Sequence, residues 1–395
     1  MRSLSILVFL MLSDVAVSTF KLSNREIAKE YREALKKFAT APQNSEERNL
    51  QGTLTGVSSD DKAARRSSYM NFKKFAEKVY EINHDDTSTF TAKINKFSIE
   101  PESDFNTHFG MNMSASFDDE MFDDMDSEVL IEEKILEKRE AVELPESIDW
   151  RYTMSEVAHQ RNCGSCWAFC AISSVESAYY RATGLRKKFS FQELLDCVFE
   201  EKQWGNGCKG ASINTGFLWV TREKRLASRE DYKYVAKDGE CKKNSYSNSY
   251  TNAGLKRLYR VPKTEKDLME AVVEGVVGVG IKGGRSLLAY DSGIYYDKYL
   301  CRATAYPNHA VNLVGYGEKG GEKYWLLRNS WGKDWGIEGG HWRMTRDYNN
   351  HCKIHETALR LDLQCKGNLK QCEEQKKFDQ KKAIEFAKLF EKKLV

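Results

Sequence analysis

Residues 160–167 read Gln160-Arg161-Asn162-Cys163-Gly164-Ser165-Cys166-Trp167 and lead directly into a helical pattern. An apolar stripe follows Cys166 at helical spacing and is formed by Ala168, Ile172, Val175 and Tyr179. This pattern places Cys166 at the N-terminus of a helix, where the helix dipole stabilises a negative charge. A thiol acts as a nucleophile through its thiolate, so Cys166 is a candidate for covalent catalysis.

Two later blocks supply the partners that a catalytic thiol needs. Asn308-His309-Ala310-Val311 places a histidine 143 residues after Cys166, and Trp325-Leu326-Leu327-Arg328-Asn329-Ser330-Trp331-Gly332 places an asparagine 163 residues after it. An imidazole must present the correct nitrogen to the sulfur, which requires a fixed acceptor on its other nitrogen. The side-chain oxygen of Asn329 can supply that acceptor, so the three residues together predict a nucleophilic site.

These blocks, with Gly315-Tyr316-Gly317, Trp335-Gly336 and Gly339-Gly340, resemble the papain family of cysteine peptidases from Leu144 to about Leu361. The resemblance implies an α+β, two-lobed fold with a helical left lobe and a β-barrel-like right lobe, preceded by a mostly helical propeptide. It also implies a cysteine endopeptidase that is made as a zymogen and hydrolyses protein or peptide substrates. No cofactor and no metal are expected.

The resemblance assigns a role to each residue of the site. Cys166 is the nucleophile, His309 its acid/base partner and Asn329 the group that orients the histidine, while Trp331 covers the His309–Asn329 hydrogen bond. The Gln160 side chain and the Cys166 backbone N–H are the implied oxyanion donors. The implied substrate-binding residues are Gly210, Ala211, Ile213, Gly280, Pro307, Asn308, Trp331 and Thr357.

Four of these residues describe the pocket for the side chain two residues before the cut. By resemblance Ile213, Gly280 and Pro307 line it and Thr357 forms its base. None carries a carboxylate, so an arginine buried there would lack a partner, and we expect an apolar side chain to be preferred. Ala211 departs from the family pattern because it places a methyl group where a glycine is expected to pair with the substrate backbone.

All ten cysteines lie beyond residue 160. By resemblance Cys163 pairs with Cys208, Cys197 with Cys241 and Cys301 with Cys352. One catalytic thiol leaves an odd number of cysteines, so at least one more must be free, and Cys170 is the candidate. Cys365 and Cys372 could close a small loop of their own.

The chain divides into four parts. Residues 1–18 predict a signal peptide, with an apolar run and a small-residue site at Ala16-Val17-Ser18. Residues 19–141 are expected to be an inhibitory propeptide with an acidic linker at 118–140, and cleavage is expected between about Lys134 and Glu143. Residues 142–362 form the peptidase domain, and 363–395 form a Lys-rich C-terminal extension.

Periodicity predicts the main elements outside the helix at Cys166. Helices are expected over 22–38 and around 69–83, and strands over 90–95, 276–281, 311–314 and 324–327. By resemblance the second helix, with Phe72, Val79 and Asn83, and the segment Ile94-Asn95-Lys96-Phe97-Ser98 belong to the inhibitory propeptide. The extension predicts an amphipathic helix with Phe378, Ala383, Phe386, Ala387, Phe390 and Leu394 on one face, although a solvated tail fits equally well.

The charge distribution and the targeting signals limit the partners and compartments that the chain can have. Residues 1–141 carry 19 Lys and Arg against 26 Asp and Glu, and the remainder carries 42 against 32. This asymmetry predicts that the two parts dock electrostatically and that docking weakens as pH falls. No nucleic-acid motif is present, and no later segment is apolar enough to span a bilayer. We expect a monomer that enters the secretory pathway and acts outside the cell or in lysosomes.

Other interpretations remain open at this point. Cys163-Gly164-Ser165-Cys166 could be a zinc half-site or a redox pair, but no second half-site is present. A catalytically silent binding or storage protein of the same fold is the main alternative, and an acyl transferase is another. The four residues expected to act in catalysis are all present, which favours the endopeptidase; they are Gln160, Cys166, His309 and Asn329.

Overall fold

The computed structural model describes residues 22–39, 62–111, 130–131, 144–200, 206–223, 225–243, 246, 250–251, 255–302, 306–346, 348, 350–363 and 368–392. The expected signal peptide, the expected cleavage region, Cys365, Leu394 and all of the acidic linker except 130–131 lie outside these residues. Within the described ranges, no helix is both long and apolar enough to cross a membrane.

The first lobe is built from helices around α5, which begins at Cys166 and ends where Gly184 adopts a left-handed φ of 71°. Its helices are α5 (Cys166–Thr183), α6 (Phe191–Glu200) and α7 (Ile213–Arg222), and β4 (Arg225–Leu226) pairs with β5 (Tyr250–Thr251) at its edge. Buried apolar side chains of α5, α6 and α7 form one continuous core. This is the helical lobe that the sequence predicts.

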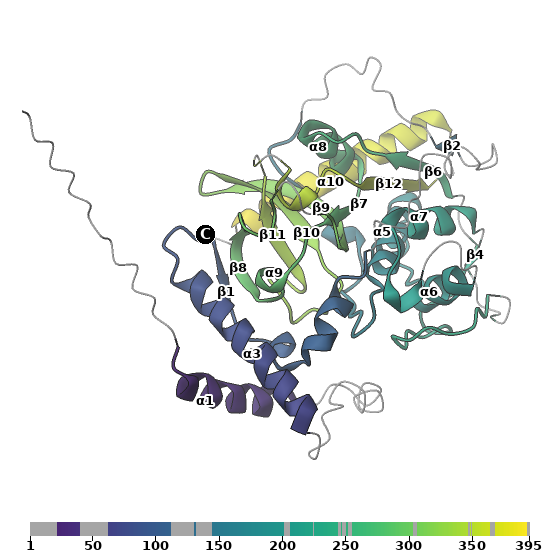
Figure 1. Cartoon of the computed structure of the whole chain (residues 1–395). Coiled ribbons are helices and arrows are strands. Elements are labelled where there is room, and N and C mark those ends of the chain that lie inside the picture. The colour runs from purple at the N-terminus through teal and green to yellow at the C-terminus, as the bar shows by residue number, and fades with distance from the viewer. Residues whose placement is uncertain are drawn as a thin grey trace, which may run out of the picture.

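The second lobe is built around a sheet (Figure 1). Its strands run in the order β1-β8-β11-β10-β9-β7-β12-β6-β2, and β3 pairs with β9. The elements are β2 (Leu130–Ile131), β3 (Ile148–Asp149), β6 (Leu255–Arg260), α8 (Glu265–Glu274), β7 (Val277–Ile281), α9 (Arg285–Leu288), β8 (Tyr290–Tyr295), β9 (His309–Lys319), β10 (Glu322–Arg328), β11 (His341–Thr345) and β12 (Ala358–Leu363). A separate apolar core fills this lobe, so the predicted two-lobed α+β fold is confirmed.

The N-terminal segment lies against the second lobe and runs to the boundary between the lobes (Figure 1). It comprises α1 (Asn24–Ala34), a π-helical turn at Leu35–Ala39, α3 (Lys62–Asn83) and β1 (Phe90–Ala92), followed by 3-10 turns at Lys96–Ile99 and Glu102–His108. β1 adds an edge strand to the sheet, with Phe90 opposite Gly293 of β8. Asn83 fixes the approach of this strand because its side chain exchanges two 2.8 Å hydrogen bonds with the backbone of Ala92.

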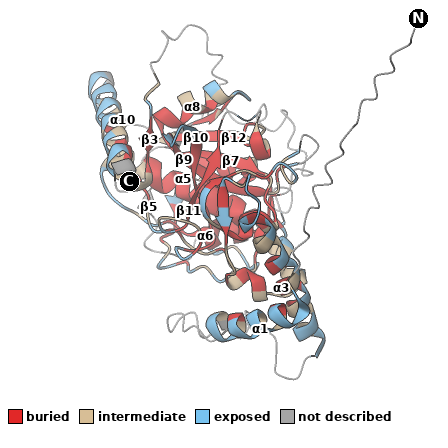
Figure 2. Ribbon diagram, turned by 90° about the vertical axis from the view of Figure 1, so that its left-hand side faces the viewer, coloured by how far each residue is buried: buried red, intermediate tan, exposed pale blue. Residues whose placement is uncertain are grey.

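The C-terminal extension forms α10 (Leu369–Lys392). This helix packs along one side of the molecule, with its outer face exposed and its inner face buried (Figure 2). Ala383 and Ala387 are buried, but Phe378 is 60% exposed, so its placement on the same face as the alanines was wrong. Phe378 lies more than a quarter turn from the alanines, because successive helical residues advance by 100°.

The described disulfides link Cys163 to Cys208, Cys197 to Cys241 and Cys301 to Cys352, as the resemblance implied. Cys166 and Cys170 are free and buried. Cys372 is disulfide-bonded, and its expected partner Cys365 lies outside the described residues.

Candidate active site

Cys166 is the first residue of α5 and is fully buried. Its sulfur accepts a hydrogen bond from the Ala310 backbone N–H, with 3.4 Å between nitrogen and sulfur, and the Gly110 backbone N–H also acts on the thiol. Burial raises the pKa of the Cys166 thiol to about 11, although these N–H groups act to lower it. The thiol is therefore neutral while the N-terminal segment covers it.

His309 begins β9, one residue before the Ala310 N–H that contacts the sulfur. Its Nε2 lies 2.8 Å from Oδ1 of Asn329, while its Nδ1 has no hydrogen-bond partner among the described residues. The Trp331 ring stacks on the imidazole, with centroids 4.8 Å apart. Burial lowers the pKa of His309 to about 4, and the hydrogen bond to Asn329 opposes this shift. The structure thus leaves Nδ1 as the nitrogen available for proton transfer.

Gln160 is fully buried and its amide is held at both ends. Its Oε1 accepts a 2.5 Å hydrogen bond from Oγ of Ser330, which fixes which end of the amide carries the N–H groups. Its Nε2 donates to the carbonyl oxygens of Cys163 at 3.0 Å and Thr107 at 3.2 Å. A preorganised N–H donor in the segment that leads to the buried thiol suits stabilisation of an oxyanion.

Comparison with known proteins identifies the family of the chain. Residues 144–360, more than half of the chain, match the model of the papain family cysteine protease. The chain belongs to the papain family of cysteine proteases. Fruit bromelain of Ananas comosus is 32% identical over 319 residues, which cover 78% of this chain and 83% of bromelain. Rattus norvegicus procathepsin L is 37% identical over 225 residues, covering 55% of this chain and 65% of that relative.

Solved precursor structures share the fold. Digestive procathepsin L 3 of the Tenebrio molitor larval midgut superposes with a TM-score of 0.66 and 26% identity, over 85% of this chain and 99% of that one. The recombinant stem bromelain precursor superposes with a TM-score of 0.65 and 28% identity, over 86% of this chain and 99% of that one. The chain is therefore a papain-like cysteine endopeptidase precursor, and its N-terminal segment is a propeptide that lies on the protease domain.

The propeptide enters the site as Phe109-Gly110-Met111. The Phe109 ring packs edge-on against His309, with centroids 5.7 Å apart. Gly110 passes so close to the nucleophile loop that a Cβ on it would lie 1.9 Å from the Gly164 carbonyl oxygen. Its own carbonyl accepts a 3.1 Å hydrogen bond from the Ala211 N–H. The propeptide backbone thus occupies the space directly over Cys166.

Met111 occupies the position where the resemblance places the substrate pocket. Its N–H donates to the Asn308 carbonyl at 2.9 Å, and its backbone pairs with Ala211.

The residues expected to line the pocket surround the Met111 side chain. A Cβ on Gly280 would lie 2.6 Å from Cε of Met111 and 3.3 Å from Cβ of Pro307. Ile213 belongs to the same apolar cluster. The Thr357 carbonyl accepts the Gly280 N–H at 2.9 Å, and Gly210 approaches Gly110 from the other side.

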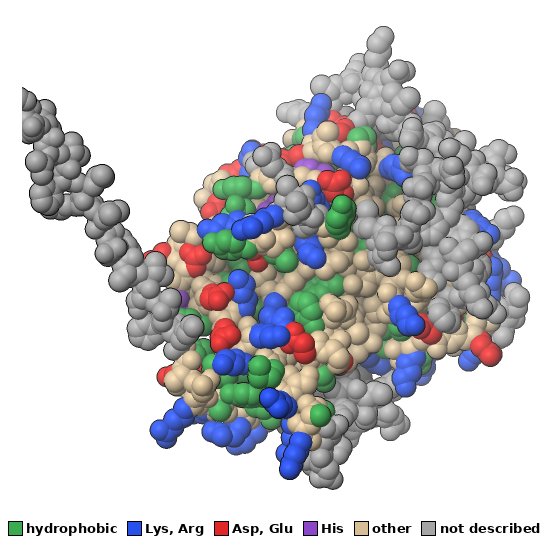
Figure 3. All heavy atoms as spheres, viewed as in Figure 1, with side chains coloured by type: hydrophobic (Ala, Val, Ile, Leu, Met, Phe, Trp, Pro, Cys, Tyr) green, Lys and Arg blue, Asp and Glu red, His purple; other side chains and the backbone are tan. Residues whose placement is uncertain are grey.

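The described ionic contacts between propeptide and protease run against the expected charge pattern. Lys93 pairs with Asp291 at 2.7 Å and Lys96 with Asp334 at 3.0 Å, so the propeptide supplies the cation in both. Only the 2.9 Å pair of Glu102 with Arg285 has the expected polarity among the described residues. The reason is compositional: residues 22–39 and 62–111 carry 13 Lys and Arg against 10 Asp and Glu. Figure 3 shows basic side chains gathered over α1 and α3.

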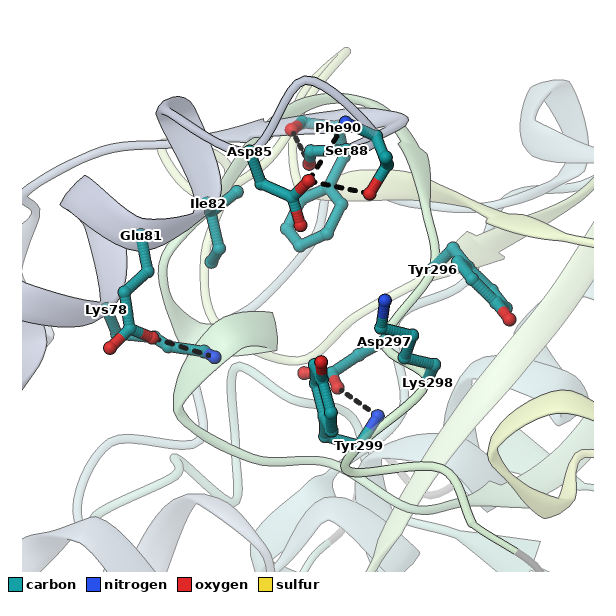
Figure 4. Close-up of a pocket in the computed structure, with 11 residues that line it drawn as sticks. Lys78, Glu81, Ile82, Asp85, Ser88, Phe90, Tyr296, Asp297, Lys298 and Tyr299 are labelled. Carbon is teal, nitrogen blue, oxygen red and sulfur yellow. Dashed lines mark hydrogen bonds and ion pairs between the residues drawn. The ribbon is translucent and has the colours of Figure 1, made fainter. Parts of the chain in front are cut away.

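Two further features lie away from Cys166. A cavity of about 200 Å³ opens between the end of α3 and the loop after β8, lined by Lys78, Asp85, Tyr296, Lys298 and Tyr299 among others (Figure 4). Cys301, His351 and Cys352 bring their ligand atoms within 4.8 Å of one another. The two sulfurs form a disulfide, however, so this cluster does not bind a metal in the oxidised protein.

Sequence reasoning missed several residues of the site. Ser330 holds the Gln160 amide, yet a serine beside an asparagine carries no signal of its own. Phe109, Gly110 and Met111 lie within the expected propeptide but were not singled out as the residues that enter the site, although a glycine between two large apolar residues is typical of a close backbone approach. Tyr234 lies 74 positions from Gln160 and was not singled out at all.

Proposed function

We propose that the chain hydrolyses internal peptide bonds through Cys166, His309, Asn329 and Gln160. His309 Nδ1 takes the thiol proton, the thiolate attacks the peptide carbonyl, and the oxyanion is bound by the Gln160 amide and the Cys166 backbone N–H. His309 then protonates the leaving amine, and water hydrolyses the thioester. The pairing of His309 Nε2 with Asn329 carries the proposal, because it leaves Nδ1 without a hydrogen-bond partner among the described residues while the next residue, Ala310, contacts the Cys166 sulfur through its N–H.

The decisive experiment compares two neighbouring thiols. Cys166→Ala should abolish peptide hydrolysis by the matured protein and its labelling by a thiol-directed epoxide peptide. Cys170→Ser should retain most of the activity, because the Cys170 sulfur is buried and its 3.1 Å contact is to the Val311 carbonyl. Exchange of the two phenotypes would refute the assignment, and absence of labelling in a folded, matured protein would favour a silent binding protein.

The zymogen arrangement is part of the same proposal. Residues 19–141 act as the intramolecular inhibitor and residues 142–362 as the peptidase domain, with cleavage between about Lys134 and Glu143. Contacts of Gly110 with the thiol and of Gln160 with the Thr107 carbonyl support this, since both block groups that the reaction needs. Sequencing the N-terminus of the matured protein tests the boundary.

For specificity, we propose a preference for an apolar side chain two residues before the cut. Met111 supports this because an unbranched apolar side chain already fits against Gly280. A peptide library in which arginine is favoured over leucine at that position would contradict the proposal. Gly280→Ala should reduce turnover of leucine and methionine substrates, because the added methyl group narrows the space that Met111 occupies.

We further propose that the protein passes through the secretory pathway and acts as a monomer outside the cell or in lysosomes. The three described disulfides support an oxidising folding compartment. Fractionation of expressing cells and sedimentation of the purified precursor test these two statements.

A further inference from the structure

The hydroxyl of Tyr234 lies between two residues of the loop that carries the proposed catalytic groups. It donates a 2.7 Å hydrogen bond to the backbone carbonyl of Gln160. It also lies 2.7 Å from Oγ of Ser165, the residue directly before the nucleophile. A single hydroxyl thus connects the backbone of the proposed oxyanion donor to the N-terminus of α5.

The direction of both hydrogen bonds follows from the proton count. A tyrosine hydroxyl has one proton, and a backbone carbonyl can only accept. The Tyr234 proton therefore goes to Gln160, and the Ser165 hydroxyl donates to the Tyr234 oxygen at 2.7 Å rather than to the Cys163 carbonyl, which lies 3.4 Å away. Gln160 and Ser165 are both fully buried, so loss of the bridge would leave polar groups without this partner away from bulk water.

Aromatic packing holds the Tyr234 ring in place. The ring meets Phe169 of α5 edge-on, with centroids 4.9 Å apart, and meets Phe191 at the start of α6 edge-on at 6.3 Å. Phe169 and Phe191 stack on each other at 3.9 Å. Because α5 carries both Phe169 and Cys166, the hydroxyl is fixed relative to the nucleophile.

We propose that Tyr234 is a positioning residue that sets the distance between the two oxyanion donors, the Gln160 side chain and the Cys166 backbone N–H. The position of the Gln160 amide depends on the Gln160 backbone, and the position of the Cys166 N–H depends on Ser165. The Tyr234 hydroxyl is hydrogen-bonded to both residues. The inference rests on the proposed function, because it needs Gln160 to act in the oxyanion site. A small displacement of a preorganised donor weakens binding of the transition state more than binding of the substrate.

Tyr232 provides a matched control two residues away in the same segment. Its hydroxyl donates at 2.7 Å to Oδ2 of Asp196, on α6, and none of its described contacts reaches residues 160–166. Tyr232→Phe and Tyr234→Phe each remove one hydroxyl that is hydrogen-bonded within the fold, at constant ring packing. Both variants should lower the unfolding temperature, but only Tyr234→Phe should affect the chemistry.

The test measures kcat and KM of both matured variants on a peptide substrate, normalised to thiols counted by iodoacetamide. For Tyr234→Phe we expect kcat to fall by about 10-fold to 100-fold with KM changed less than about twofold. The rate of iodoacetamide alkylation should stay the same, because that reaction develops no oxyanion. Tyr232→Phe should keep kcat within about twofold of the parent protein.

A double-mutant cycle with Gln160→Ala separates this inference from the proposed function. If Tyr234 acts through Gln160, Tyr234→Phe should have little further effect on kcat once Gln160 is alanine. If Gln160→Ala slows turnover while Tyr234→Phe does not, or if both tyrosine variants slow it equally, the inference fails and the proposed function stands. If Gln160→Ala leaves kcat unchanged, the oxyanion assignment fails and the inference falls with it.

Discussion

Burial in the precursor, to which the propeptide contributes, sets the charge state of Cys166 and His309. It raises the pKa of Cys166 to about 11 and lowers the pKa of His309 to about 4, so both groups are neutral at every pH between these values. Removing Phe109 and Gly110 would return water to both side chains and reduce the desolvation that causes the shifts. The helix N-terminus can then stabilise a thiolate beside a protonated imidazole.

The difference in thiol pKa between precursor and matured protein predicts a different pH profile of thiol alkylation for each. The Cys170→Ser variant is the best one to measure, because it leaves one free thiol fewer to react. In the intact precursor the iodoacetamide rate should rise about tenfold per pH unit up to pH 9 without a plateau, because the thiol pKa is raised to about 11. In the matured protein the rate should be nearly constant above about pH 6. A precursor rate that levels off below pH 7 would show that the thiolate already exists under the propeptide.

Gly110 is the residue whose replacement should release the propeptide most directly. A Cβ at this position would lie 1.9 Å from the Gly164 carbonyl oxygen, so the backbone must move away from the cleft. We expect Gly110→Ala to weaken docking by ~1–3 kcal/mol and to raise the activity of uncleaved precursor on a small peptide about tenfold or more. Gly184→Ala is the control: it strains the end of α5 at a φ of 71° but has open space around it. Equal activation by both variants would contradict the clash as the cause.

At this scale, the sequence pointed to the residues that we propose for the chemistry and missed the residues that hydrogen-bond to them. Cys166, His309 and Asn329 were found because nucleophilic catalysis requires those side chains, and they stand in recognisable blocks. Ser330 and Tyr234 act through single hydroxyls whose partners are known only once the chain is folded. The same holds for Gly110, whose role depends on how closely two backbones approach.

Among the elements, α10 shows how periodicity can predict a helix without predicting where it docks. The helix packs on the turn after β3, where the Tyr152 hydroxyl donates to the Asp379 carbonyl at 3.1 Å and Phe386 contacts the Tyr152 ring. Lys376 also reaches Glu274 of α8 at 2.9 Å. Small alanines, rather than the largest aromatics, mark the buried face because the helix lies close to the protease surface. The extension is therefore a packed part of the fold.

A pair of lysine substitutions tests this docking. Ala383→Lys should lower the free energy of unfolding by ~2–4 kcal/mol, or detach α10, because Ala383 is fully buried in the apolar core and a longer, charged side chain must displace its neighbours. Leu389→Lys should change it by less than about 0.5 kcal/mol, since Leu389 is 60% exposed. Thermal unfolding and limited proteolysis of α10 measure both effects. Similar stability of the two variants would mean that α10 is loosely attached.

For the whole molecule, the sequence predicted a propeptide that lies on the protease domain but not the polarity of the contacts between them. Residues 1–141 carry an acidic excess as a whole, but the propeptide residues that the structure describes, 22–39 and 62–111, carry a basic excess. Net charge therefore could not reveal the polarity of the contacts, since Lys93 and Lys96 pair with aspartates of the domain. Backbone pairing of β1 and the Phe109-Gly110-Met111 contacts hold the propeptide beside these pairs.

Two carboxylates of the propeptide give its docking opposite responses to pH. Burial acts to raise the pKa of Glu102, but hydrogen bonds from Lys74 and Arg285 lower it overall. Burial raises the pKa of Asp104, which accepts a 2.8 Å hydrogen bond from Asn162. Glu102 thus favours docking above its released-state pKa and loses this contribution as pH falls through its docked value. Asp104 favours docking when protonated and opposes it as pH rises through its docked value.

We therefore expect opposite effects from two isosteric substitutions at pH 7. Glu102→Gln should loosen the propeptide, because it removes the charge that faces Arg285, and Asp104→Asn should tighten it, because it removes a half-buried anion while leaving an acceptor for Asn162. Conversion of Cys166→Ala precursor by a trace of matured enzyme reports docking without self-processing. Glu102→Gln should be cleaved faster and Asp104→Asn more slowly than the parent at pH 7, with both differences narrowing towards pH 4.

The Glu102 effect should be modest and should shrink in high salt, because its side chain is 41% exposed. Slower cleavage of Glu102→Gln, or faster cleavage of Asp104→Asn, would show that these carboxylates do not set the pH response of the precursor.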